Sequence, residues 1–101
     1  MEANLTISPD HSALPGHFPG NPVVPGVVIL DEIVQLWLKA HPGFRLTAIP
    51  AAKFLSVLRP GETCRVRFDA AAQESVNFDC FSGDRRIAQG RLMFGPLRHE
   101  S

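Results

Sequence analysis

The sequence lacks an excess of charge of either sign, because ten lysine and arginine residues balance ten aspartate and glutamate residues. Zero formal net charge produces no long-range field that would attract phosphate backbones or anionic lipids. Nucleic acids and membrane surfaces are therefore not expected as partners, and an acidic protein partner would have to be met by a local basic patch. Near-zero net charge also favours self-association, which is compatible with an oligomer.

Cysteine is scarce and long apolar runs are missing. Cys64 and Cys80 are too few for a disulfide framework, and the alternating apolar residues around each predict strands with buried free thiols. The longest apolar run, Val23 to Leu30, is interrupted by Pro25 and Gly26 and is far shorter than the roughly 20 residues of a membrane span. The first residues contain no basic segment followed by an apolar run, so we expect no signal peptide and a cytoplasmic location.

The remaining composition is that of a globular protein, with 45% hydrophobic and 20% charged residues among 101. A chain of this length supports about one hydrophobic core. We therefore expect a single domain over residues 1–101.

Proline–glycine pairs divide the chain, and three of the five pairs fall between Pro15 and Gly26. Proline fixes φ and glycine permits positive φ, so this segment is predicted to be a pre-shaped loop that loses little entropy on ordering. Loops of this kind often carry functional residues.

Residues 27–40 predict a helix that ends before His41-Pro42-Gly43. At about 100° per residue its polar side chains share one stripe, and the rest of the helix surface is apolar. That stripe contains Asp31, Glu32, Gln35 and Lys39. So apolar a helix has to be covered by another layer, most simply a sheet.

After Gly43 apolar and polar residues alternate, which indicates half-buried antiparallel strands. We expect strands over 44–58 (bent at Pro50), around 64–69 and 76–80, over 86–94, and a short one over 4–8. One long helix with about five or six antiparallel strands is an α+β architecture.

Three residue types suited to acid–base chemistry lie within a short stretch. Gly26 is at the expected helix start, where a backbone N–H without a neighbouring Cβ could polarise a carbonyl oxygen; the alternative is a helix start that simply needs a small residue. Asp31 lies at the edge of the polar stripe, where partial burial would suit a proton donor, and Gln35 at i+4 could hydrogen-bond it. The alternative for Asp31 is an ordinary acidic residue in the first half of a helix.

His17 is the one histidine in the stiff loop, and a lone histidine is more often structural or exposed than catalytic. A base that titrates near neutrality, a carboxylic acid and a bare N–H together are nevertheless the groups required to remove a proton next to a carbonyl. We therefore take His17, Asp31 and Gly26 as the candidate catalytic set. No cysteine–histidine ligand spacing and no phosphate-binding glycine loop is present, so no metal or organic cofactor is expected.

The stretch from Gly16 to Gln35 resembles the signature of the bacterial 3-hydroxyacyl-ACP dehydratases, Gly-His-Phe-Pro-Gly-x-Pro-x-x-Pro-Gly-Val followed by an acid and a glutamine. Ala52-Lys53-Phe54 and Arg59-Pro60-Gly61-Glu62 are similar to a later strand and turn of that family. The likeness is greatest to the compact dehydratases of specialised pathways such as aryl-polyene synthesis. Two features depart from the pattern of that family. Position 31 is aspartate, where glutamate is commoner, and we expect the N-terminal helix and strands of the housekeeping enzymes to be absent.

The resemblance implies a hot-dog fold, in which a curved antiparallel sheet wraps one long central helix. It implies a homodimer in which His17 of one subunit meets Asp31 of the other, with Gly26 holding the thioester carbonyl and Gln35 supporting the acid. Phe18, Pro25 and Val27 are the substrate-binding residues expected from it. The substrate would be a 3-hydroxyacyl chain on acyl carrier protein, in fatty-acid, aryl-polyene or polyketide-like synthesis, and the product the trans-2-enoyl thioester.

Two other functions stay open. Hot-dog proteins include acyl thioesterases, which use a carboxylate and water, and the spacing of histidine and acid disfavours these. The chain could also be a non-catalytic partner subunit. Arginines such as Arg65, Arg67, Arg85 and Arg86 could dock an acidic carrier, or could be solvated side chains on the outer face of the sheet.

Overall fold

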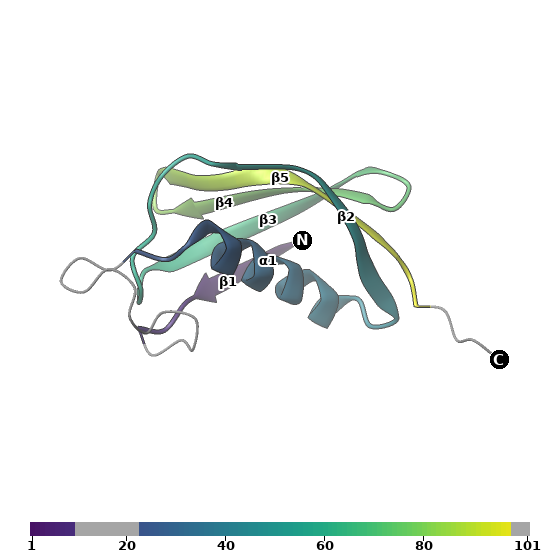
Figure 1. Ribbon diagram of the computed structural model, residues 1–101, viewed down its shortest axis with the longest axis horizontal. Helices are drawn as coiled ribbons and strands as arrows, with labels where there is room; N and C mark the ends of the chain where they lie inside the picture. Colours follow the sequence, from purple (N-terminus) through teal and green to yellow (C-terminus); the bar gives the residue numbers. More distant parts are fainter. Residues whose placement is uncertain (10–22, 98–101) are drawn as a thin grey trace.

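The computed structural model describes residues 1–9 and 23–97, which form one helix and one five-stranded sheet (Figure 1). The elements follow in the order β1 (Glu2–Thr6), α1 (Gly26–Ala40), β2 (Phe44–Phe54), β3 (Thr63–Ala72), β4 (Ser75–Ser82) and β5 (Arg85–Pro96). All pairings are antiparallel, in the spatial order β1-β3-β4-β5-β2, and α1 lies along one face of the sheet. The α+β prediction is confirmed.

Element boundaries differ from the sequence prediction by a few residues. The helix begins at Gly26, since proline at position 25 lacks an N–H and the first helical acceptor is its carbonyl group. β1 lies two residues earlier than expected, and β2 ends at Phe54 rather than at residue 58. The irregularity expected at Pro50 is present, because the pairing of β2 with β5 shifts register between Leu46 and Ala51.

The core lies between α1 and the inner face of the sheet. The helix contributes five buried side chains, of which Ile33 is fully buried, and burying such a side chain stabilises the fold by roughly 1.5–3 kcal/mol. Alternate residues of β3 and β4 face it, including Val66, Phe68 and Phe78. Cys64 and Cys80 are buried free thiols, as predicted. Within the part of the chain that the structure describes, no helix is long and apolar enough to cross a membrane.

The far end of the helix is fixed by aromatic stacking. The Trp37 ring lies between the rings of His41 and Phe94, each with its centroid 3.8 Å away, and Phe44 meets Trp37 edge-on at 5.5 Å. The His41 ring Nδ1 lies 2.9 Å from the Trp37 carbonyl oxygen. These contacts hold the C-terminal turn of α1 against β2 and β5.

The segment between β2 and β3 is anchored through Glu62. Its carboxylate accepts hydrogen bonds from the Ser82 hydroxyl at 2.7 Å, from the Arg59 N–H at 3.0 Å and from the Arg85 guanidinium. The bonds from Ser82 and Arg59, with that from Arg85, lower the pKa of Glu62 from 4.5 to about 2. In the same segment, the Leu58 carbonyl accepts a hydrogen bond of 2.7 Å from the Val24 N–H. This bond fixes the residues that lead into α1.

Glu62→Gln is therefore expected to lower the free energy of unfolding at pH 7 by about 1 kcal/mol, a value reduced for the partial exposure of the pair. Because the folded pKa of Glu62 is depressed, its contribution is present above pH 4.5 and is lost as the pH falls towards about 2. Urea unfolding at pH 7, 4 and 2.5 should show the difference between wild type and variant shrinking with acidity. A difference that does not change with pH would contradict this. Glu2→Gln, which removes an exposed ion pair with Arg65, is the control with little effect.

Candidate active site

The start of α1 presents backbone N–H groups that precede the helical hydrogen-bond ladder. The Pro25 carbonyl accepts from Val28 at 3.0 Å and from Ile29 at 3.2 Å, so the N–H groups of Gly26 and Val27 precede the first N–H that donates within the helix. No side chain of the residues that the structure describes caps this end, and the first turn contains no acidic residue. The positive end of the helix dipole is thus available to developing negative charge.

Gly26 also has a packing role that the sequence analysis left open as its alternative. A Cβ added at Gly26 would lie 3.0 Å from both Cε2 and Cζ of the Phe54 ring. The ring at the end of β2 therefore lies directly against the first residue of the helix. Glycine at position 26 therefore makes room for the Phe54 ring, and this role does not depend on what the Gly26 N–H binds.

Asp31 lies one and a half turns into α1 and lines a hollow of about 170 Å³. The other walls are apolar, with Val27, Leu30 and Val34 from the helix and Leu46 and Ile49 from β2. The Asp31 side chain is exposed in the single chain. The partial burial that we expected for it is therefore not supplied by this chain alone.

The remaining predicted residues are placed as follows. Gln35 is exposed, and the hydrogen bond that we expected between the described side chains of Gln35 and Asp31 is not formed. Pro25 is half-buried, whereas Val27 is 74% exposed beside Asp31. His17 and Phe18 lie outside the described residues, so their roles stay predictions.

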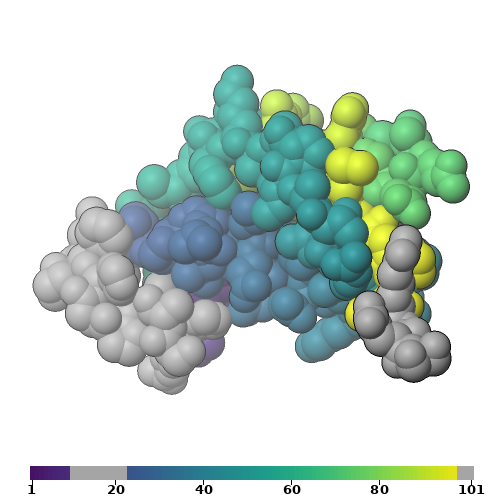
Figure 2. All heavy atoms as spheres, turned by 45° about the vertical axis from the view of Figure 1, so that its right-hand side comes forward, coloured from purple at the N-terminus to yellow at the C-terminus, as the bar shows by residue number. Residues whose placement is uncertain are grey.

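Leu46 and Ile49 were not named by the sequence analysis, and Phe54 was named only within a strand similar to one of the family, although all three form the β2 side of this region. The signal available in the sequence was their apolar character; the structure adds that almost all residues of this strand are exposed. In Figures 1 and 2, α1 and β2 lie beside one another on one face of the molecule. This face of α1 and β2 therefore carries most of the predicted site.

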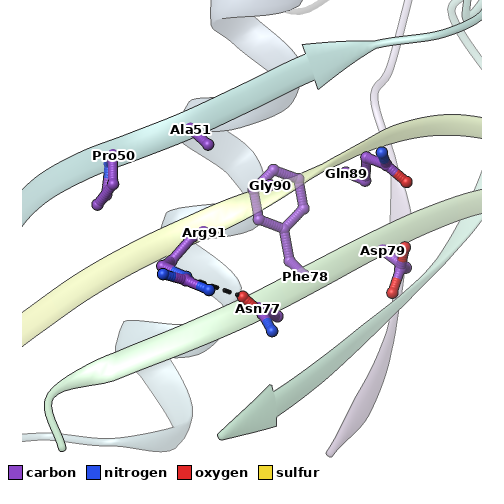
Figure 3. A pocket seen from close by; sticks show the side chains of 8 residues that line it. All are labelled: Pro50, Ala51, Asn77, Phe78, Asp79, Gln89, Gly90 and Arg91. Carbon is purple, nitrogen blue, oxygen red and sulfur yellow. Dashed lines mark hydrogen bonds between the residues drawn. The ribbon is translucent and has the colours of Figure 1, made fainter. Parts of the chain in front are cut away.

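A broader hollow of about 550 Å³ lies over β2, β4 and β5 (Figure 3). It is bordered by polar side chains, among them Asn77 and Arg91, which are joined by a hydrogen bond of 3.2 Å. Of the predicted catalytic residues, the two that the structure describes, Gly26 and Asp31, do not border it. Among residues 1–9 and 23–97, no three histidine, cysteine, aspartate or glutamate side chains gather in a way that could hold a metal ion.

Four arginines considered for carrier docking have acidic partners within the chain. Arg65 pairs with Glu2 at 3.3 Å, and Arg67 and Arg86 both approach Asp79, at 3.5 and 3.7 Å. Arg85 binds Glu62 and donates to the Val57 carbonyl at 2.9 Å. These local ion pairs favour the alternative that the four arginines are side chains of the outer face of the sheet and do not dock a carrier protein.

Comparison with known proteins identifies the family. The ApeI-like family model, described as ApeI dehydratase, matches residues 1–91. The 3-hydroxyacyl-[acyl-carrier-protein] dehydratase FabZ of Pediococcus pentosaceus is 34% identical over 90% of this chain and 68% of its own length. That of Lactiplantibacillus plantarum is 36% identical over 90% of this chain and 69% of its own length.

Solved structures agree with the fold. A chain of the dehydratase heterocomplex ApeI:P from Xenorhabdus doucetiae superposes with a TM-score of 0.76 at 26% identity, over 92% of this chain and 84% of that one. A point mutant of the fluoroacetyl-CoA-specific thioesterase FlK also reaches 0.76, over 96% of this chain and 87% of that one, but at 15% identity it shows the fold alone. The chain has the hot-dog fold and belongs to the ApeI-like dehydratase family.

Proposed function

We propose that this dehydratase removes water from a 3-hydroxyacyl thioester carried on acyl carrier protein and releases the trans-2-enoyl thioester. The observation that carries the proposal is the position of Asp31, a carboxyl group that lines an apolar hollow one and a half turns from the N-terminus of α1. The relatives named as 3-hydroxyacyl-[acyl-carrier-protein] dehydratases support the same substrate class. A cytoplasmic location is part of this proposal.

The proposed reaction uses three groups. The Gly26 N–H donates to the thioester carbonyl, which increases the acidity of the C2 proton. His17 takes that proton, and the electron pair left at C2 forms the C2–C3 double bond as the C3–O bond breaks. Asp31 in its acid form gives its proton to the departing hydroxyl, which leaves as water. Proton exchange with solvent then restores neutral His17 and protonated Asp31.

We also propose that two copies of the chain pair across α1 and β2. Exposed large apolar side chains gather on the helix, on β2 and on the segment that follows it: Val27, Phe44, Ile49, Phe54, Leu55 and Val57. β2 is an edge strand with β5 on one side only, so its second edge can pair with another strand. Covering this face would enclose Asp31 and the apolar hollow that it lines.

The oligomer is tested by solution mass. The wild type is expected at twice its chain mass of 11.1 kDa in native mass spectrometry. Ile49→Glu, which places a charge on the exposed side of β2, should yield monomers with turnover lowered at least about tenfold. Gln73→Glu in the β3–β4 turn is the control and should stay dimeric. A wild-type monomer that turns substrate over would contradict the pairing.

The reaction is tested with purified wild type and 3-hydroxyacyl and trans-2-enoyl thioesters of short and medium chain length on acyl carrier protein. The expected results are the appearance of the enoyl product and, in reverse, its hydration. Release of free thiol without loss of water would instead indicate a thioesterase. Absence of turnover on every thioester would favour a non-catalytic partner subunit. Such a subunit would pair with a different chain, and the Xenorhabdus relative is indeed part of a heterocomplex.

A further inference from the structure

Phe54 is held in a fixed place at the end of β2. Its backbone pairs with Ala88 of β5, and the next two N–H groups, of Leu55 and Ser56, donate to the Ile87 carbonyl at 2.8 and 3.4 Å. The strand end cannot shift without breaking these bonds. The position of the ring relative to α1 is therefore set by the sheet.

The ring contributes little to the core. Phe54 is 45% exposed, whereas Phe78 and Phe94 are each only 1% exposed. A large apolar ring kept at a half-exposed position gains much less from burial than a core ring does. The ring lies close to Gly26, because a Cβ added at Gly26 would be 3.0 Å from two ring carbons.

We propose that Phe54 is a specificity-determining residue, which forms the wall beside C2 of the substrate and excludes branched acyl chains. This inference rests on the proposed function, in which the Gly26 N–H holds the thioester carbonyl. A carbonyl oxygen so held lies roughly 3 Å from the amide nitrogen, and C2 is two bonds from that oxygen. The ring already occupies the space beside the same residue, so a substituent on C2 has to share it with the ring.

The consequence is a preference among substrates that retain the same reacting groups. A 2-methyl-3-hydroxyacyl thioester still carries one proton at C2 and can be dehydrated by the same steps. Its extra methyl group would meet the ring edge. One methyl group in an apolar site typically changes the relative kcat/KM by about 10–200-fold.

The experiment compares 3-hydroxybutyryl and 2-methyl-3-hydroxybutyryl thioesters on acyl carrier protein, as the ratio of their kcat/KM values. The wild type should prefer the unbranched substrate by at least about tenfold, and Phe54→Ala should reduce that preference at least about tenfold. Phe54→Leu should fall between the two. The ratio is the informative quantity, because a general loss of stability lowers both rates and leaves it unchanged.

Phe44→Ala is the matched control, since Phe44 is also on β2 and is 40% exposed but lies at the opposite end of the strand, against Trp37. It should keep the wild-type ratio, and far-UV circular dichroism should show that each variant is folded. An active wild type whose substrate ratio is unaltered in both Phe54 variants overturns this inference but leaves the proposed function standing. A wild type inactive on both substrates overturns the proposed function, and this inference with it.

Discussion

Asp31→Asn and His17→Ala are each expected to lower kcat/KM for dehydration about 10²-fold or more. Asparagine keeps the shape of the side chain but cannot give a proton to the departing hydroxyl, and alanine at 17 leaves no base for the C2 proton. The measurement is enoyl thioester formation by wild type and variants at equal concentration. Because Asp31 is an exposed side chain in the single chain, Asp31→Asn should leave the fold intact.

Two further variants separate chemistry from charge and shape. Asp31→Glu retains a carboxylic acid that can give a proton to the departing hydroxyl, so it should recover part of the activity. Glu32→Gln removes a negative charge about 100° further round the helix and should retain most of the activity. Asp31→Asn with more than a tenth of wild-type turnover would exclude Asp31 as the proton donor. His17→Ala with similar turnover would exclude His17 as the base.

The sequence could predict the part of the site that lies on the helix. The position of the helix follows from its apolar pattern and from His41-Pro42-Gly43, and Gly43 indeed adopts a positive φ of 96° after the last turn. The spacing of Gly26 and Asp31 on one helix then follows from helical geometry alone. Both residues lie where the pattern predicted them.

The non-local part could not be predicted in the same way. Register shifts between Leu46 and Ala51 break the alternation of β2, so the sequence does not show which of its side chains border the helix. The contact of Phe54 with Gly26 joins a strand end to a helix start that are far apart in the chain. The partial burial expected for Asp31 is not observed either, because its side chain is exposed on the helix. The second copy that would cover it is part of our proposal.

Gly90→Ala is expected to destabilise the protein by about 3 kcal/mol, and to lower Tm by more than about 10 °C. Gly90 pairs with Phe78 on one side and with Ala52 on the other. Figure 3 shows the Phe78 ring beside Gly90. A Cβ there would overlap the Ala51 carbonyl oxygen and would lie 2.7 Å from Cε2 of Phe78. The Ala51 carbonyl belongs to the backbone of β2, and the Phe78 ring is only 1% exposed in the core. Moving either group away from the added Cβ therefore costs free energy.

Gly95→Ala on the same strand is the control, because its added Cβ would meet only the end of the Thr47 side chain at 3.3 Å, and the expected change is below about 1 kcal/mol. Thermal unfolding of the two variants and wild type measures both effects. Equal melting temperatures for the two variants would show that the sheet yields at Gly90 and would contradict the close approach of β2 to β5.

If the clash instead forces β2 outward, the strand that carries Leu46, Ile49 and Phe54 moves away from α1. The remaining folded Gly90→Ala protein should then also lose activity, although residue 90 borders neither Asp31 nor Gly26.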